Sequence, residues 1–96
     1  MEQISDMEAL SEIAEILKSI AHPVRICIVR GLLHEGECNV SKMHSCLNVP
    51  QSTLSQHLAK LRSLGIIRGR RSGTEIYYQV VDDTVIKVIQ ALFSKE

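Results

Sequence analysis

The sequence predicts a mainly α-helical fold with a small β-hairpin, in the order four helices, two strands and a last helix. Three observations support this prediction. Apolar residues recur at the three- and four-residue steps of a helix through most of the 96-residue chain. Between residues 66 and 81 the pattern changes to the alternation that is typical of strands. A turn rich in arginine and glycine, "GRRSGT", lies inside that alternating segment.

The first two predicted helices meet at a proline. An amphipathic helix covers about residues 7 to 21, with an apolar stripe that consists of Leu10, Ile13, Ala14, Leu17, Ile20 and Ala21. Pro23 follows His22 and suits the first turn of a new helix. This second helix ends near His34 and is predicted to be a core element because of its apolar residues, Val24, Ile28, Val29, Leu32 and Leu33.

Two more helices follow, with only a short connection between them. Ser41 is expected to cap a short third helix that turns Met43 and Leu47 inward. The fourth helix covers about residues 51 to 64, and Gly65 follows it where a left-handed C-cap residue is expected. Its inward stripe consists of Leu54, Leu58, Leu61 and Leu64.

A hairpin and a last helix complete the chain. The segment from Ile66 to Arg68 can pair with the alternating run that starts at Ile76, and Gly73 is available for a positive φ in the turn. The last helix covers about residues 83 to 94, with an apolar stripe of Val85, Val88, Ile89 and Leu92. We therefore expect one domain over residues 1–96, in which residues 40–64 form a helix-turn-helix unit and residues 66–81 form a hairpin.

The composition favours a small protein of the cytoplasm that has no membrane partner. No apolar run approaches the ~20 residues that span a bilayer. The first ten residues hold three acids and no base, unlike a signal peptide. Three cysteines, an odd number, fit a reducing compartment. Apolar residues near both ends predict that a second copy covers them, because a chain this short buries only a limited core alone.

The charges are unevenly distributed although the formal net charge is zero. The central segment, residues 38–81, contains one acid, Glu75, and six basic residues, which are Lys42, Lys60, Arg62, Arg68, Arg70 and Arg71. The flanking segments carry the compensating acids. Because local charge decides whether a surface attracts phosphate, the central segment is a candidate for binding nucleic acid.

One face of the fourth predicted helix is polar but uncharged. Opposite its leucines, a helical projection places Gln51, Ser52, Ser55, Gln56 and Ala59. Glutamine can pair with adenine, serine can donate or accept at base edges, and alanine can pack on a thymine methyl. This face predicts a helix that reads a DNA major groove. Taken alone, it also fits a polar surface on an ordinary helical bundle.

The arginine-rich hairpin that follows favours the DNA interpretation. Arg68, Arg70 and Arg71 would lie beside the groove and meet phosphates or enter a minor groove. A winged module that binds protein is the main alternative, but such modules often carry acids where this segment has only Glu75. Catalysis is not expected, because the positions of the serines, cysteines and histidines in the sequence do not indicate a Ser-His-Asp triad or a Cys-His nucleophile pair.

The segments "AHPVRICIVRGLL" and "NVSKMHSCLNVPQSTLSQHLAKLRSLGIIRGRRSGTEIYYQV" closely resemble the ArsR/SmtB family of bacterial winged helix-turn-helix repressors, over about residues 10 to 93. The resemblance implies a homodimer built from the first and last helices. It also implies binding to an imperfect inverted repeat of double-stranded DNA. The repression that results from this binding is expected to be relieved by an inducer. The base-contacting positions that it implies are those of the helical projection: Gln51, Ser52, Ser55 and Gln56. His57 and Lys60 lie nearby and are expected to meet phosphates.

The sequence departs from the metal sites of this family. The arsenic and cadmium type needs a C-x-C, but Cys38 stands one position early, and Asn39 and Ser41 occupy the ligand positions. The zinc type needs histidines on the last helix, and no histidine follows His57. We therefore predict no metal site and no cofactor. Asp82 and the next aspartate are expected to cap the last helix.

Cysteine chemistry remains open as a source of regulation. Cys27 lies between two isoleucines and is expected to be a partly buried, inert thiol. Cys38 lies in a predicted loop and is expected to be the most accessible thiol, while Cys46 is expected to be half-buried. The candidate thiol-sensing residues are Cys38, Cys46 and Cys27. A thiol switch at Cys38, and sensing of metal or oxidant through Cys38 and Cys46, are alternatives to regulation by abundance or by a partner. The sequence does not decide between a small-molecule and a redox inducer.

Overall fold

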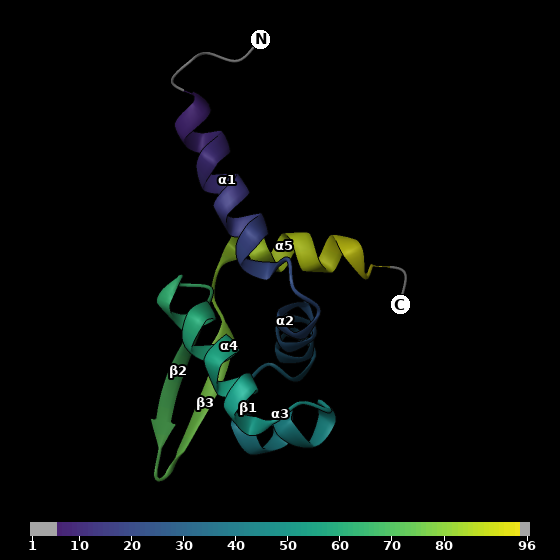
Figure 1. Ribbon diagram of the computed structural model, residues 1–96, viewed down its shortest axis with the longest axis vertical. Helices are drawn as coiled ribbons and strands as arrows, with labels where there is room; N and C mark the ends of the chain where they lie inside the picture. Colours follow the sequence, from purple (N-terminus) through teal and green to yellow (C-terminus); the bar gives the residue numbers. More distant parts are fainter. Residues whose placement is uncertain (1–5, 95–96) are drawn as a thin grey trace.

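The computed structural model describes residues 6–94, and the ends of the predicted domain, residues 1–5 and 95–96, lie outside this described part. Figure 1 shows a helical body with a narrow hairpin on one side. The elements are α1 (Asp6–Ile20), α2 (Pro23–Glu35), β1 (Cys38–Asn39), α3 (Val40–Cys46), α4 (Gln51–Ser63), β2 (Ile67–Ser72), β3 (Glu75–Val80) and α5 (Asp83–Leu92). The predicted fold, mainly helical with a hairpin, is confirmed.

The sheet has a third strand that the sequence did not predict. The strands are antiparallel in the order β1-β3-β2, with Cys38 opposite Tyr78 and Asn39 opposite Tyr77. A strand of two residues is too short to show an alternating pattern. It forms because β3 offers it an unpaired edge.

Side chains cap three of the helices. The Nδ1 of His22 accepts a hydrogen bond from the N–H of Val24 at the start of α2. Asp82 caps α5 as predicted, since its carboxylate accepts from the N–H of Val85 at 2.9 Å. The predicted cap at Ser41 is wrong. Asn39 caps α3 instead, and its side-chain oxygen accepts from the N–H of Lys42 at 2.9 Å.

The two predicted left-handed glycines are confirmed. Gly65 follows α4 with φ 75°, and Gly73 forms the hairpin turn with φ 64°. Both conformations are unfavourable for residues with a Cβ. They set where α4 ends and where β2 turns back as β3, and so fix the hairpin beside α4.

The core lies between α2, α3, α4, α5 and the inner face of the sheet, and the end of α1 contributes Ile20. Leu54, Leu58 and Leu61 are at most 1% exposed, as the predicted stripe requires. Leu64 does not belong to this stripe, because it is 45% exposed. It follows the last residue of α4 and falls about a quarter-turn away from the other three leucines. Ile66 takes its place in the core.

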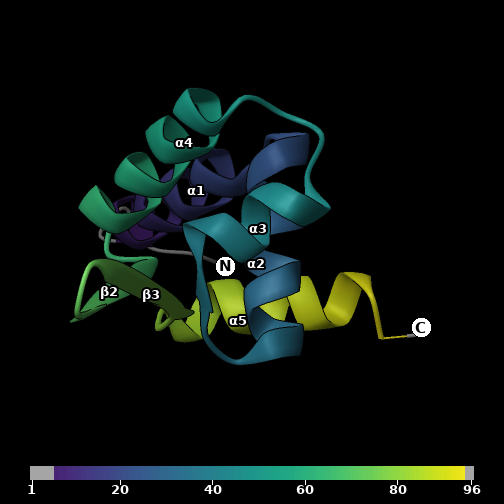
Figure 2. The same ribbon diagram turned by 90° about the horizontal axis from the view of Figure 1, so that it is seen from below.

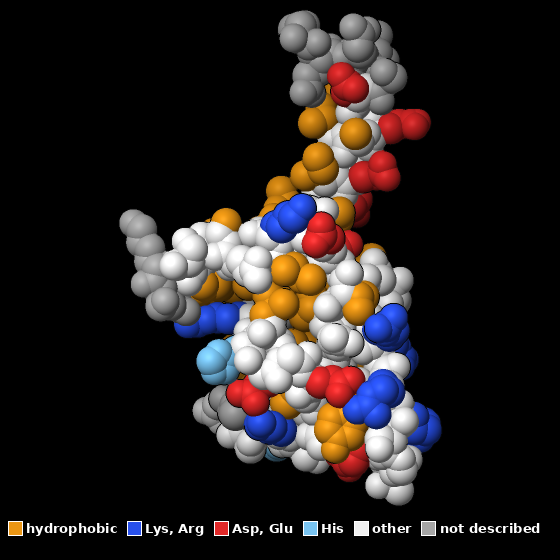
Figure 3. Space-filling view, turned by 180° about the vertical axis from the view of Figure 1, so that it is seen from behind, with side chains coloured by type: hydrophobic (Ala, Val, Ile, Leu, Met, Phe, Trp, Pro, Cys, Tyr) orange, Lys and Arg blue, Asp and Glu red, His pale blue; other side chains and the backbone are white. Residues whose placement is uncertain are grey.

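Helix α1 projects away from this body (Figure 1). The radius of gyration is 14.6 Å, whereas a compact domain of this length is expected to have about 12.5 Å. One side of α1 carries large apolar residues that are 42–58% exposed, namely Met7, Leu10, Ile13 and Leu17. Figure 3 shows hydrophobic side chains along one side of the projecting helix and acidic side chains on the other. Within the described residues, no helix combines the length and the apolar character needed to cross a membrane.

Candidate nucleic-acid interface

Helices α3 and α4 and the hairpin form one side of the molecule. In Figure 2, α4 lies beside the β2–β3 hairpin while α5 passes behind α2. Helix α4 contacts α2, α3 and β2, so its buried leucines hold it against all three. The opposite side of α4 therefore faces solvent, next to a hairpin that carries three arginines.

The exposed side of α4 presents unoccupied hydrogen-bonding groups. All four predicted base-contacting residues are exposed, namely Gln51, Ser52, Ser55 and Gln56. Within the described part of the chain, none of their side chains makes a hydrogen bond. Ala59 is exposed beside them. The face therefore offers amide and hydroxyl groups to a partner without first breaking internal bonds.

The first turn of α4 adds a second kind of donor. Pro50 is the N-cap residue, and no side chain caps the helix. The free N–H groups of a first turn carry partial positive charge and favour a phosphate nearby. They lie at the end of α4 that carries Gln51.

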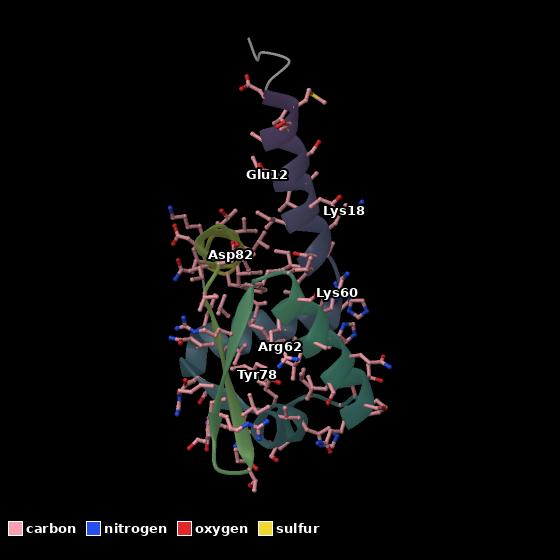
Figure 4. All side chains as sticks on the ribbon, turned by 90° about the vertical axis from the view of Figure 1, so that its left-hand side faces the viewer. Glu12, Lys18, Lys60, Arg62, Tyr78 and Asp82 are labelled. Carbon is pink, nitrogen blue, oxygen red and sulfur yellow. The ribbon has the colours of Figure 1, made fainter. Side chains whose placement is uncertain are left out.

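Two basic residues flank the polar face. Figure 4 shows Lys60 leaving α4 away from the hairpin and Arg62 leaving it toward the hairpin. Both are exposed, and neither makes an ion pair among the described residues. Lys60 was predicted as a phosphate contact. The sequence analysis assigns Arg62 no role beyond its place in the basic segment. The helical projection that selects Gln51 nevertheless places Arg62 within about 20° of it.

The three predicted hairpin arginines have different surroundings. Arg68 and Arg71 are exposed, and neither makes an ion pair within the described residues. Arg70 instead reaches across the sheet to Glu37, to which it donates two hydrogen bonds of 2.8 and 3.0 Å. Its guanidinium also lies over the ring of Tyr77. The hydrogen bonds raise the pKa of Arg70 and lower the pKa of Glu37.

His57 points back toward α2 and away from the polar face. Its Nδ1 accepts a hydrogen bond of 3.0 Å from the Nε of Arg25, which also donates to the backbone oxygen of Ser19. Its ring centroid lies 4.4 Å from that of His22. Burial, helped by His22 and Arg25, lowers the pKa of His57. Arg25 thus connects α4 to the end of α1. The sequence analysis predicts no role for this residue.

The exposure of two cysteines is the reverse of the prediction. Cys27 is exposed, whereas Cys38 is buried. Cys38 is covered because β1 pairs with β3, and the outward side of α2 leaves Cys27 open despite its isoleucine neighbours. The side chain of Cys46 lies outside the described part of the structure. Among the described residues, no group of three or more His, Cys, Asp or Glu could hold a metal ion.

Comparison with known proteins places this geometry in a family. A helix-turn-helix domain model matches residues 20–70. The chain is 40% identical over 84 residues to the transcriptional repressor PagR of Bacillus anthracis, covering 88% of this chain and 84% of that protein. The chain belongs to the ArsR/SmtB family.

Solved structures of repressors support the same assignment. The crystal structure of PagR covers 90% of this chain and 98% of that chain with a TM-score of 0.81. The repressor BigR of Xylella fastidiosa is 35% identical, with a TM-score of 0.84, and covers 97% of this chain and 95% of that chain. Like other members of the ArsR/SmtB family, the chain is a DNA-binding transcriptional repressor with a winged helix-turn-helix fold, and it is not an enzyme.

Proposed function

We propose that this repressor acts in the cytoplasm as a homodimer that reads an inverted-repeat operator through α4. The observation that carries the proposal is the uncharged face of α4. Four exposed side chains there have free donors and acceptors, beside a hairpin that carries cations. Gln51, Ser52, Ser55 and Gln56 contact base edges in the major groove.

The apolar side of α1 supports the dimer. A second copy of α1, together with α5, would cover the half-exposed stripe and Leu92, which is 64% exposed. Two-fold symmetry then repeats α4 at two half-sites. For successive major grooves these half-sites lie about 34–36 Å apart, or a multiple of that distance.

The basic residues supply contacts that do not depend on sequence. Lys60, Arg62, Arg68 and Arg71 are exposed and without ion-pair partners in the described chain, so they are available to phosphates. Arg70 contacts DNA only after it leaves Glu37. His57, which the sequence suggested as a phosphate contact, supports the interface by holding Arg25.

Binding of matched and scrambled duplexes across a range of salt tests these assignments. Gln51→Ala or Ser55→Ala should cost ~1–3 kcal/mol on the matched duplex and leave the scrambled duplex unaffected. Arg71→Ala should weaken both duplexes similarly and reduce the salt slope by about 1. Gln90→Ala is the matched control, because this exposed glutamine lies away from the apolar stripe of α5 that is proposed to meet the second copy. Equal affinity of the wild type for every duplex, or no binding at low salt, would defeat the proposal.

A further inference from the structure

A pocket of about 150 Å³ lies between α2, β1 and α3, and its inner wall is apolar. Ile28 and Leu32 of α2 and Met43 of α3 are buried there, together with Cys38 of β1. Leu47, just after α3, is half-buried at the same wall. The pocket thus borders the first helix of the helix-turn-helix unit.

The mouth of the pocket is formed by exposed residues. Cys27, Gly31 and Glu35 lie on α2, and Lys42 faces them from α3. The Nζ of Lys42 donates a hydrogen bond of 2.6 Å to Glu35. This bond joins α2 to α3 at the rim. Because both side chains are exposed, the ion pair adds little to the stability of the contact between the two helices.

Gly31 is unusual because nothing in the fold requires a glycine there. It lies inside α2, where glycine destabilises a helix relative to alanine. It is not one of the glycines with positive φ among the described residues, and a Cβ added to it would meet no atom within 4 Å. Residues 27, 28, 31 and 35 share one helix face. A side chain at position 31 would therefore enter the space at the mouth, and glycine keeps that space open.

The size and lining of the pocket define the class of ligand. An apolar cavity of about this volume accommodates a molecule the size of benzene. Sulfur atoms of cysteine and methionine are polarizable and pack well against aromatic rings. A charged ligand is disfavoured because the buried wall offers it no ionic partner. We propose that the pocket binds a compact, uncharged, ring-shaped molecule of about six to eight non-hydrogen atoms, and that its binding lowers affinity for DNA.

The coupling to DNA follows from the contacts of α3. This helix forms one wall of the pocket and packs against α4 and β1. A ligand that fits this pocket stabilises the present arrangement of α2 and α3, and it would therefore oppose any shift of α3 and α4 that DNA binding requires. The coupling rests on the proposed function, whereas ligand binding itself does not. Allosteric couplings of this kind change affinity by about 5- to 150-fold.

Thermal unfolding with toluene as the probe tests binding. At a tenfold excess over its Kd, toluene should raise the Tm of the wild type by about 5 °C or more. Gly31→Leu places a side chain in the mouth and should abolish the rise. Gly31→Ala also removes the glycine from α2 but leaves most of the space at the mouth open. Toluene should therefore still raise the Tm of this variant. Toluene should also slow the reaction of Cys27 with a thiol reagent in the wild type.

Binding to a duplex selected from a random pool tests the effect on DNA. Toluene should raise the Kd of the wild type for DNA by at least about fivefold and leave that of Gly31→Leu unchanged. No rise in Tm, or an equal rise in Gly31→Leu, would overturn the pocket assignment. A rise in Tm with unchanged affinity for DNA would overturn the effector role. Failure to bind DNA without toluene would instead contradict the proposed function, and the melting experiment would still test the pocket.

Discussion

Replacing Leu10 and Ile13 of α1 with glutamine should separate the proposed dimer into monomers. Both residues lie on the projecting apolar side, 42% and 48% exposed. Together, the exposed surfaces of these two residues equal about one whole side chain in each protomer. The partner would bury this surface in the dimer. Burial of a leucine or isoleucine side chain contributes about 1.5–3 kcal/mol. With two copies of α1, the double substitution should therefore cost about 3–6 kcal/mol of dimer stability.

This loss corresponds to an increase of about 10²- to 10⁴-fold in the dimer dissociation constant. Sedimentation velocity over a range of protein concentrations measures it directly. Glu8→Gln with Glu12→Gln, on the acidic side of the same helix, is the matched control and should stay dimeric. The reasoning would be refuted if the wild type sedimented as a monomer at micromolar concentration, or if the double variant dissociated no more readily than the control.

Three further predictions concern single positions. Glu37→Gln should release Arg70 and raise affinity for every duplex by a similar factor, measured by fluorescence anisotropy; a gain for one sequence alone would contradict this. The pKa of His57 is lowered below its usual value of 6.5, so the unfolded chain takes up a proton first and stability should fall as the pH drops through that value. His57→Gln should flatten this fall in Tm between pH 8 and 5, and an unchanged profile would count against it. Leu58→Ala should lower the free energy of unfolding, measured in urea, by about 2–5 kcal/mol, because Leu58 is only 1% exposed. A loss below about 1 kcal/mol would contradict its place in the core.

Local patterns predicted the helices and the candidate interface. The period of the leucines defines α4, and the same period places Gln51 and Ser55 on the opposite, exposed face. Gly65 and Gly73 were predictable because each stands at a turn that needs a positive φ. These features depend on neighbours a few residues away, so the sequence contains the information needed to find them.

Features that depend on distant residues were not predictable in this way. The pairing of Arg70 with Glu37 joins positions 33 residues apart, and the bond between Arg25 and His57 joins positions 32 apart. Cys38 is buried because β1 pairs with a strand far along the chain. In each case the partner is brought in by tertiary structure, which the local sequence does not show.

Selection of bound duplexes from a random pool tests most directly the claim that two copies of α4 read DNA. The enriched sequences should form an inverted repeat with half-sites centred about 10–10.5 base pairs apart, or a multiple of this spacing. Gln51→Ala should change the preferred base within each half-site while keeping the spacing. Enrichment of a single, unrepeated site, or an unchanged preference in the Gln51 variant, would contradict the claim.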